Sequence, residues 1–554
     1  MRVHSLIEHI DSNNFLQQYL KAKGIKNTKD YLSPSPNNFD NPWGYADMKE
    51  AVNRVNDIIV GGGKIGIVQD SDADGVMSAT IAYRFLQDMG MEEIPVFIHS
   101  GKQHGLTFSE DDNIVQQIID SQVNMVWVPD AGSNDWEQCK RLWDEANIEV
   151  LITDHHLYDK NDYAFVINVH NPLNDIQNHS LTGTGVTYKF IEAYRDKYAP
   201  AYEFSKFRDL VAFSIVSDVS DLTTLENRAF LFCGNKHINN PMLKEMLHKF
   251  GRKEELTPHC ISMYLAPKIN AVCRSSNMSD KKALFNGFVS DDKNIIDEAT
   301  KVASEAHTEQ SNITKELYEE LDKKIVSTSE DNIVVTFGEA EEKNYLGLAA
   351  NKLVSRYHKP CIVLRELNPT TWTGSLRSPV DVASQINTTK LAICRGHESA
   401  CGIDIKKANL KRFVKWVNKH LDIDPSYDVT GVITPSEITI KLCKDCEDWP
   451  QLWGISGGNI LVIPTFYVEV NVKKEELFFC GKKNNSVKIT KSDVDFWMFR
   501  CDEKELNKLT RYPEFTLKMI VKLGVNSWEG KTNPKAIVDN FEVEQYEETF
   551  EDVF

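Results

Sequence analysis

Three acidic clusters, each following a short apolar run, lie in the first third of the chain. Their members are Asp70, Asp72 and Asp74 in the first cluster, Asp130 in the second, and Asp154, His155 and His156 in the third. Carboxylate oxygens are the ligands that Mg²⁺ prefers, and an added imidazole shifts the preference towards Mn²⁺. Two such ions held side by side can hydrolyse a phosphodiester with little further help. These residue types therefore predict a two-metal site for phosphate-ester hydrolysis.

The elements that must position these clusters are short, continuously apolar strands. Such runs lie at 65–68, 96–98, 125–128 and 150–152, and helix-like segments separate them. Strands alternating with helices predict a parallel, doubly wound sheet. Ligands bind beyond the carboxyl ends of the strands in such sheets, and all three clusters follow a strand end. The pattern therefore predicts that the clusters converge at one edge of one sheet.

A chain of 554 residues is too long for one ordinary core, so several domains are expected. A charged stretch at 294–328 has apolar residues at helical spacing and no Gly or Pro, which predicts a long connecting helix. After about residue 425 the pattern changes to strands separated by polar turns, which suggests a small barrel. The predicted divisions are a helical lead at 1–45, an α/β domain at 46–235, a helical region at 236–330, a second α/β domain at 331–424, a strand-rich domain at 425–543 and an acidic tail at 544–554.

Composition limits the class of protein. The formal net charge of −18 argues against a protein that coats nucleic acid, although a local basic channel is enough to bind phosphates. Eleven cysteines without a framework spacing predict reduced thiols. The chain has no apolar run of about 20 residues and no signal-peptide core, so we expect a cytoplasmic protein without membrane contact.

Further motifs follow the acidic clusters in a fixed order. They are Tyr31-Leu32-Ser33-Pro34, Asn171-Pro172, Gly183-Thr184-Gly185-Val186, Ser217-Asp218, Glu226-Asn227-Arg228, Ala266 to Ala271 with Arg274, Gly374 to Ser378, Gly396-His397 and Asn526 to Gly530. With the three clusters, this series resembles the DHH phosphoesterase superfamily and, within it, the RecJ-type single-strand-specific exonucleases. The resemblance implies a doubly wound parallel-sheet DHH domain, a long connecting helix, a smaller α/β DHH-associated domain and a C-terminal OB-like β-barrel.

The resemblance also implies roles for individual residues. Two divalent ions, Mn²⁺ or Mg²⁺, would activate water for attack on phosphorus and neutralise charge on the phosphate. The implied ligands are Asp70, Asp72 and Asp130 for one ion, and Asp74, Asp130, His155 and Asp218 for the other. His156 would contact the scissile phosphate, and Asp154 would orient the neighbouring histidines. Asp130 would thus be shared between the two ions.

Substrate contacts are implied on both sides of the metal site. The implied residues are Asn270 and Arg274 near the metals, and Ser375, Arg377 and His397 in the DHH-associated domain. Two positions depart from the family pattern. Arg395 precedes Gly396-His397 where the family usually has a second Gly, and the loop at 99–105 lacks the expected Pro-x-Arg. Lys102 or His104 of that loop is expected to substitute at the 5′ end of the strand.

The resemblance predicts a monomeric exonuclease that digests single-stranded DNA from 5′ to 3′ into 5′-mononucleotides, in recombination, repair or replication. One alternative is a superfamily phosphodiesterase for oligonucleotides or cyclic dinucleotides, which the barrel and the N-terminal lead disfavour. Another is a non-catalytic DNA-binding scaffold of the same fold, which the retained ligands disfavour. The acidic tail at 544–554 ends in Phe, so we expect it either to dock on single-strand-binding, replication or repair proteins or to remain a solvated tail.

Overall fold

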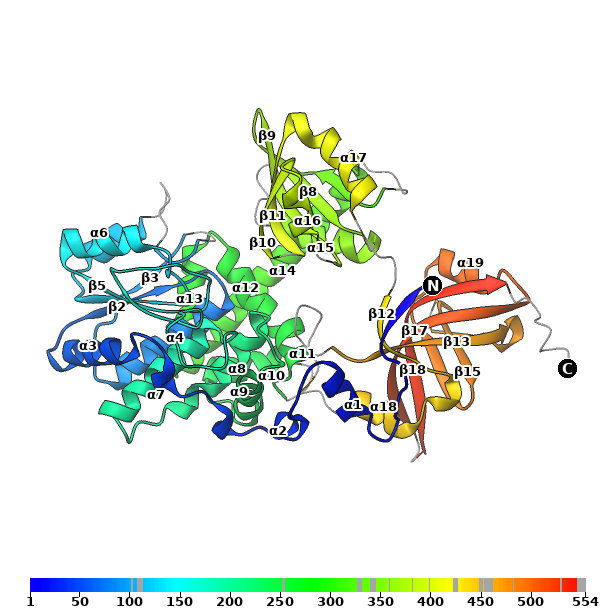
Figure 1. The fold of residues 1–554 in the computed structure, drawn as a ribbon, viewed down its shortest axis with the longest axis horizontal. Helices are drawn as coiled ribbons and strands as arrows, with labels where there is room; N and C mark the ends of the chain where they lie inside the picture. The colour runs from blue at the N-terminus through cyan, green and yellow to red at the C-terminus, as the bar shows by residue number, and fades with distance from the viewer. Residues whose placement is uncertain are drawn as a thin grey trace.

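The structure is a computed structural model, and it contains three sheets joined by a large helical layer (Figure 1). It describes residues 1–100, 103–106, 113–251, 255–325, 331–338, 345–357, 359–380, 382–397, 399–421, 427–447, 452, 462–481, 483–528 and 531–545. The parallel-sheet domain lies at one end of the long axis in Figure 1, and the C-terminal sheet lies at the other. No described helix is long and apolar enough to cross a bilayer.

The first sheet contains five parallel strands in the order β3-β2-β4-β5-β6. The strands are β2 (Ile65–Gln69), β3 (Val96–Ile98), β4 (Met125–Pro129), β5 (Glu149–Asp154) and β6 (Phe165–Asn168). Helices α3 (Met48–Val60), α4 (Ala73–Asp88) and α7 (Gly183–Tyr198) cover one face, and α5 (Ile114–Asp120) and α6 (Trp136–Ala146) cover the other. Strands covered on both faces are apolar throughout, and the predicted doubly wound parallel sheet is confirmed.

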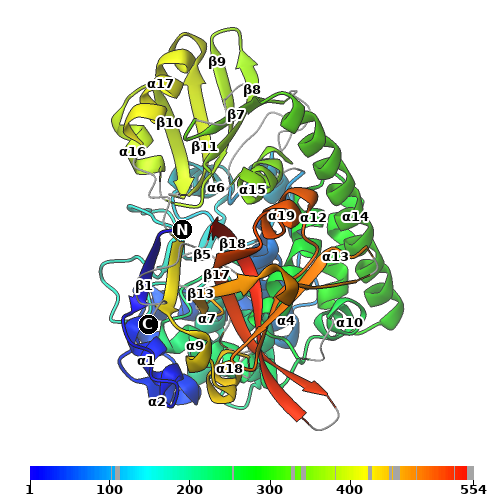
Figure 2. The same ribbon diagram turned by 90° about the vertical axis from the view of Figure 1, so that its right-hand side faces the viewer.

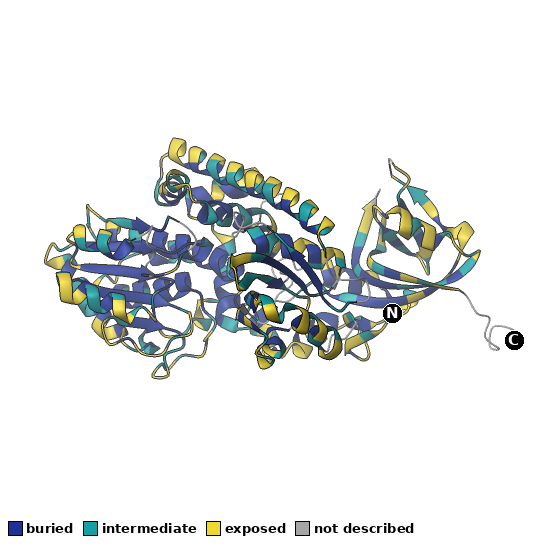
Figure 3. Cartoon of the chain, turned by 90° about the horizontal axis from the view of Figure 1, so that it is seen from above, coloured by how far each residue is buried: buried dark blue, intermediate teal, exposed yellow. Residues whose placement is uncertain are grey.

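A group of helices extends this core rather than forming a separate one. Its members are α8 (Arg208–Ser217), α9 (Leu225–Lys236), α10 (Pro241–Phe250), α11 (Pro258–Cys260), α12 (Ala266–Arg274), α13 (Met278–Val289) and α14 (Lys293–Lys323). Buried residues of these helices share one cluster with α4 and α7. The predicted connecting helix is α14, which spans about 45 Å and exposes a continuous outer face (Figures 2 and 3).

The second sheet contains five strands in the order β10-β11-β9-β8-β7, with only β7 and β8 parallel. Its strands are β7 (Val334–Phe337), β8 (Cys361–Asn368), β9 (Thr371–Arg377), β10 (Ala392–His397) and β11 (Ala400–Lys406). Helix α15 (Leu346–Tyr357) fills the face towards α14, while α16 (Ala383–Thr388) and α17 (Leu410–His420) cover the other face. This is the predicted second α/β domain, which follows the long helix.

The third sheet contains eight strands in the order β1-β12-β13-β17-β18-β16-β15-β14. Its strands are β1 (Val3–Ile7), β12 (Tyr427–Val432), β13 (Thr465–Lys473), β14 (Phe478–Cys480), β15 (Ser486–Lys491), β16 (Val494–Met498), β17 (Glu514–Trp528) and β18 (Lys531–Gln545), and its helices are α18 (Ile440–Glu447) and α19 (Glu503–Leu509). Among the described residues, β1 and β14 are the two edge strands of this sheet and do not pair with each other. The OB-like barrel closure therefore stays a prediction.

The N-terminal lead differs from the helical pattern predicted for residues 1–45. Strand β1 pairs in parallel with β12 of the third sheet, and α1 (Phe15–Ala22) and α2 (Thr28–Leu32) follow it. Phe15, Tyr19 and Leu20 of α1 are buried in the core of that C-terminal sheet. The two ends of the chain therefore build one domain, because apolar side chains from both are needed to fill its core.

Candidate metal centre

The three predicted clusters meet at the carboxyl edge of the parallel sheet. Strands β2, β4 and β5 are neighbours. The chain adds β3 on one side of β2 and then crosses over to add β4 on the other side. This is the switch point at which such sheets bind ligands. Three sets of ligand atoms each lie within 4.8 Å of one another: Asp70 with Asp72 and Asp130; Asp74 with His155 and Asp218; and Asp130 with Asp154, His155 and His156. The structure thus brings all the predicted metal ligands together.

Asp72 begins helix α4 and is fixed by its capping bond. Its carboxylate accepts the N–H of Gly75 at 3.0 Å, and the next N–H, that of Ala73, is accepted by Oδ1 of Asn270 at 3.1 Å. The positive end of the helix dipole favours a carboxylate at this position. Asn270 therefore supports the backbone between Asp72 and Asp74.

Asp74 is held by the first turn of helix α7. Its carboxylate accepts the N–H groups of Gly183 at 2.9 Å and Thr184 at 3.0 Å, together with the Thr184 hydroxyl. A Cβ at Gly183 would lie 2.3 Å from Oδ1 of Asp130, so only glycine fits between the two aspartates. The glycine-rich start of α7 thus sets the spacing of two candidate ligands.

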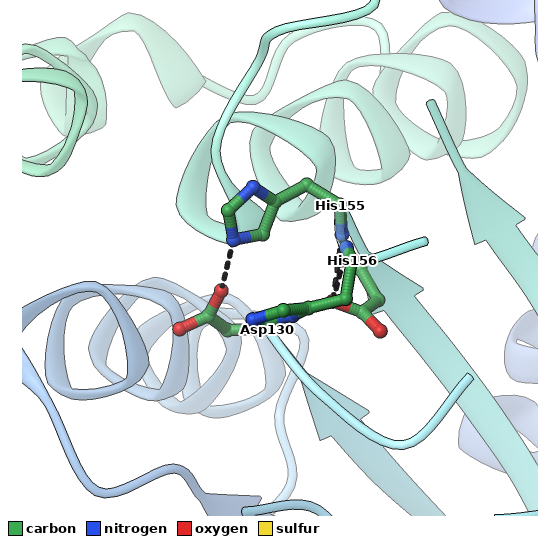
Figure 4. A group of neighbouring side chains, drawn as sticks. Asp130, His155 and His156 are labelled. Carbon is green, nitrogen blue, oxygen red and sulfur yellow. Dashed lines mark hydrogen bonds and ion pairs between the residues drawn. The ribbon is translucent and has the colours of Figure 1, made fainter. Parts of the chain in front are cut away.

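Asp130 is the most constrained ligand. Its φ of 72° is left-handed, its N–H donates to the Thr153 carbonyl at 2.8 Å, and its side chain is buried. Oδ1 lies 3.2 Å from Nε2 of His155 (Figure 4), yet it accepts no hydrogen bond among the described residues. Burial raises the pKa of Asp130 well above its usual value, and the carboxylates of Asp74 and Asp72 raise it further.

This environment fits a divalent cation. A buried carboxylate oxygen without a hydrogen-bond donor is costly, and bound cations are a common way to compensate it. The pKa of Asp218 is also raised well above its usual value, first by burial and then by Asp74 and Asp72. Oδ2 of Asp218 lies 3.8 Å from Nε2 of His155, so the last turn of α8 closes the ligand set. A set of buried oxygens with one imidazole suits Mn²⁺ or Mg²⁺.

Asp154 fixes the two histidines. Its Oδ1 accepts the N–H groups of His155 and His156 at 2.7 and 3.1 Å, and it also lies 2.8 Å from the His156 Nδ1. Its Oδ2 accepts the Ser133 hydroxyl at 2.7 Å. Burial opposes the charge on Asp154, but the His156 bonds lower its pKa to about 2, and the same contact raises the pKa of His156 to about 9. His156 is therefore a cation at the edge of the site at neutral pH.

His104 is a site residue that the sequence offered only as a replacement for strand-end binding. Its Nδ1 lies 2.6 Å from Oδ2 of Asp70, while Oδ1 of Asp70 accepts the Gly105 N–H at 3.1 Å. His99 closes this loop, since its Nε2 lies 2.8 Å from the Gly105 carbonyl. Nζ of the buried Lys281 donates to the His99 carbonyl at 2.9 Å. Both oxygens of Asp70 are thus oriented by one short loop.

We expect His104→Ala to weaken Mn²⁺ binding by about 10- to 100-fold, because partners that orient a ligand contribute to metal affinity on this scale. His104→Asn keeps a donor in a similar place and should retain most of the affinity. Titration calorimetry of the metal-free protein with Mn²⁺ measures both. Equal affinity in the wild type and the Ala variant would contradict a positioning role for His104.

The substrate-binding residues lie on two domains. Arg274 ends α12, and burial lowers its pKa. Arg377 ends β9, where its Nη1 donates to the Ser375 hydroxyl at 2.8 Å and to the Leu376 carbonyl at 2.7 Å. Burial also lowers the pKa of Arg377, and the charge of Arg274 lowers it further. Partly buried guanidinium groups such as these are suitable partners for phosphate groups.

Two predicted site residues, Lys102 and His397, have side chains outside the described part of the structure. Lys102 lies outside the described residues. His397 is described through its backbone, which pairs with Ala400 across β10 and β11. The roles assigned to both residues stay predictions.

Comparisons with known proteins agree with this geometry. Residues 64–215 match the DHH family, N-terminal domain. The YorK protein of Bacillus subtilis strain 168, described by its name as a prophage SPbeta-derived single-strand DNA-specific exonuclease, is 27% identical over 518 residues, covering 87% of each chain. The single-stranded-DNA-specific exonuclease RecJ of the same strain is 22% identical, covering 99% of this chain and 70% of its own.

Solved structures show the same fold. The structure of RecJ from Thermus thermophilus in complex with Mn²⁺ superposes with a TM-score of 0.74 at 17% identity, covering 98% of this chain and 80% of that one. The Mg²⁺ complex of that protein gives a TM-score of 0.69. Residues 64–215 thus match the DHH family, and the chain as a whole is similar in sequence to single-strand DNA-specific exonucleases and shares the fold of RecJ.

Proposed function

We propose that this protein is a metal-dependent exonuclease that hydrolyses the phosphodiester bonds of single-stranded DNA. The observation that carries the proposal is the convergence of five aspartates and His155 on the carboxyl edge of one sheet. The two relatives named as single-strand-specific DNA exonucleases, each aligned over most of this chain, support it. The charged, buried ligands also disfavour a non-catalytic scaffold, because such a cluster destabilises a fold that does not use it.

In this proposal each residue has the role that the family resemblance implies. Asp70, Asp72 and Asp130 would hold one ion, and Asp74, Asp130, His155 and Asp218 would hold the other. When bound, the ions supply an activated water and neutralise negative charge on the phosphate. His156, a cation held by Asp154, would bind a non-bridging phosphate oxygen. Arg274 and Arg377 would hold phosphate groups of the strand from the opposite side.

The proposal includes digestion from 5′ to 3′ with release of 5′-mononucleotides, by a monomer acting in recombination, repair or replication. It also includes docking on single-strand-binding or other replication and repair proteins, through a tail of which residues 546–554 lie outside the described structure. These finer statements rest on the family resemblance of the motifs. Each can be tested without assuming the others.

An end-labelling experiment tests the activity and its direction. A long single strand labelled at either its 5′ or its 3′ end is incubated with the protein and Mn²⁺, and a blunt duplex of the same sequence serves as the control. Immediate release of labelled mononucleotide from the 5′-labelled strand alone is the expected result. Release first from the 3′ end contradicts the proposed polarity. Cleavage of dinucleotides while long strands stay intact favours the oligonucleotide phosphodiesterase instead.

A further inference from the structure

The exposed face of α17 carries charge of one sign. Residues 406–420 contain six Lys and Arg residues and no Asp or Glu, in a chain whose formal net charge is −18. Phe413 and Val417 are buried on the opposite face of the helix, in the core of the second sheet. The exposed face of the longer helix α14, by contrast, mixes acidic and basic side chains. The positive face of α17 is therefore a local departure from the composition of the chain.

The exposed cations of α17 are Lys411, Arg412, Lys415 and Lys419, and we call them the basic face. Three of them recur every four residues, which aligns them in one row along the helix. None of the four has an ion-pair partner within the described parts of the chain, whereas the nearby Lys407 pairs with Glu366 at 2.9 Å. The basic face thus offers unneutralised charge to solvent.

An aromatic pair lies along the next row of the helix. The rings of Trp416, which is half-buried, and His420, which is exposed, stack with centroids 5.4 Å apart and planes at 22°. Accessible rings beside cations are the combination that proteins use to bind single strands, because bases stack on the rings and phosphates bind the cations. The pair therefore adds a second, uncharged contact to the basic face.

The folding of the helix does not account for this arrangement. Like charges four residues apart repel one another along a helix. Lys411 and Arg412 also lie in the first helical turn, where the helix dipole favours acidic side chains. Lys411 and Arg412 therefore destabilise the start of α17 unless negative charge neutralises them, whereas Lys419, in the last turn, is favoured by the dipole. A partner with closely spaced negative charges removes both penalties.

One end of α17 lies at the same end of the second sheet as Arg377. At one end of α17, Oδ1 of Asn418 accepts the N–H of Asn332, just before β7, at 2.8 Å. The start of β7 pairs with the start of β8, which lies beside Arg377. The other end of α17 follows β11, whose last residue, Lys406, pairs with Thr371 at the far end of β9. The row of cations thus runs along the sheet, and its Lys419 end lies at the same end of the sheet as Arg377.

We infer that the basic face of α17 binds the sugar–phosphate backbone of single-stranded DNA away from the scissile bond and retains the strand while its end is hydrolysed. The inference rests on the proposed function. Lysine ammonium groups are mobile point charges, which suits contacts that must tolerate any base sequence. A strand that reaches from the Arg377 side onto α17 would be longer than the few nucleotides the metal site itself holds.

The test compares two fourfold variants of the full-length protein with equal changes of net charge. K411Q/R412Q/K415Q/K419Q removes the basic face, and K293Q/K301Q/K315Q/K323Q removes four exposed lysines of α14. Binding of a fluorescent 20-nucleotide oligothymidine is measured in EDTA, which blocks metal-dependent hydrolysis, at several salt concentrations. Hydrolysis of a trinucleotide with Mn²⁺ is measured in parallel as a control for the metal centre.

We expect the α17 variant to bind the 20-mer about tenfold or more weakly and to lose about 0.7 in the salt slope for each contact removed. The α14 variant should bind as the wild type does, and trinucleotide hydrolysis should be unchanged in both. Equal affinity and salt slope in the two variants would overturn the inference. Tighter binding of a poly-glutamate peptide than of DNA of equal charge to the basic face of the wild type would also overturn the inference. A wild type that binds DNA through α17 but never hydrolyses it would instead overturn the proposed function.

Discussion

Asp130→Asn is expected to lower the rate of single-strand hydrolysis by about a thousandfold or more. The substitution keeps the shape of the side chain but removes the carboxylate that lies among both predicted ligand sets. Two metal ions stabilise developing charge by several kcal/mol, and each 1.4 kcal/mol corresponds to about tenfold in rate. Rates on a 5′-labelled strand with saturating Mn²⁺ measure the effect. A variant that keeps more than a tenth of the wild-type rate would contradict the two-metal assignment.

The same substitution should stabilise the metal-free protein. Burial and neighbouring carboxylates raise the pKa values of Asp130 and Asp218 above 3.8, so the folded protein binds protons more tightly than the unfolded chain. Stability in EDTA therefore falls as the pH rises from about 4 towards those raised values. The Asn variant lacks one of these groups, so its stability in EDTA should fall less steeply as the pH rises. Urea unfolding in EDTA at pH 4.5 and 7.5 measures the difference, and a less stable Asn variant at pH 7.5 would contradict this electrostatic account.

Lys189→Met is expected to destabilise the parallel-sheet core by about 3–5 kcal/mol, because it leaves a buried carboxylate unpaired. Lys189 is buried on α7, and its Nζ lies 2.8 Å from Oε1 of Glu226 and donates to the Asp40 carbonyl at 2.6 Å. Glu226 is buried as well. The first thermal transition should shift down by on the order of 10 °C.

Two further variants separate this ion pair from a general packing defect. Lys189→Met combined with Glu226→Gln removes both charges of this pair and should recover part of the lost stability, while Glu192, whose Oε2 lies 3.3 Å from the Lys189 Nζ, still loses its partner. Lys197→Met changes an exposed lysine of the same helix and should alter stability by about 0.5 kcal/mol or less. A double variant as unstable as Lys189→Met alone would show that the uncompensated charge of Glu226 is not the cause.

Much of the parallel-sheet domain follows from local sequence pattern. The runs at 65–68, 96–98, 125–128 and 150–152 correspond to β2, β3, β4 and β5. A strand that is covered on both faces must be apolar throughout, so these runs mark parallel strands without any knowledge of the partner. Ligands bind at the carboxyl edge of such a sheet, so the positions of the acidic clusters already indicated that they would meet.

Other features could not be read from any local pattern. Strand β6 was not predicted, although it is longer than the predicted β3, and β1 joins a sheet formed by the opposite end of the chain. The apolar residues of 1–45 recur at helical spacing. That spacing does not indicate that residues 3–7 form a strand or which distant strand they pair with. Pairings of this kind depend on how two apolar surfaces fit once the chain has closed a long loop.

For the candidate site, too, the sequence predicted some features and not others. The sequence by itself determined which residue types could hold two hard cations and which sheet edge would present them. Only the tertiary structure decided that Asn270 supports the turn between two aspartates and that His104 orients Asp70. Metal ligands recur as local motifs because the strand-to-helix turn fixes their spacing. The residues that orient those ligands belong to segments that are distant in the sequence and meet only in the folded chain. Their positions therefore cannot be predicted from any spacing in the sequence.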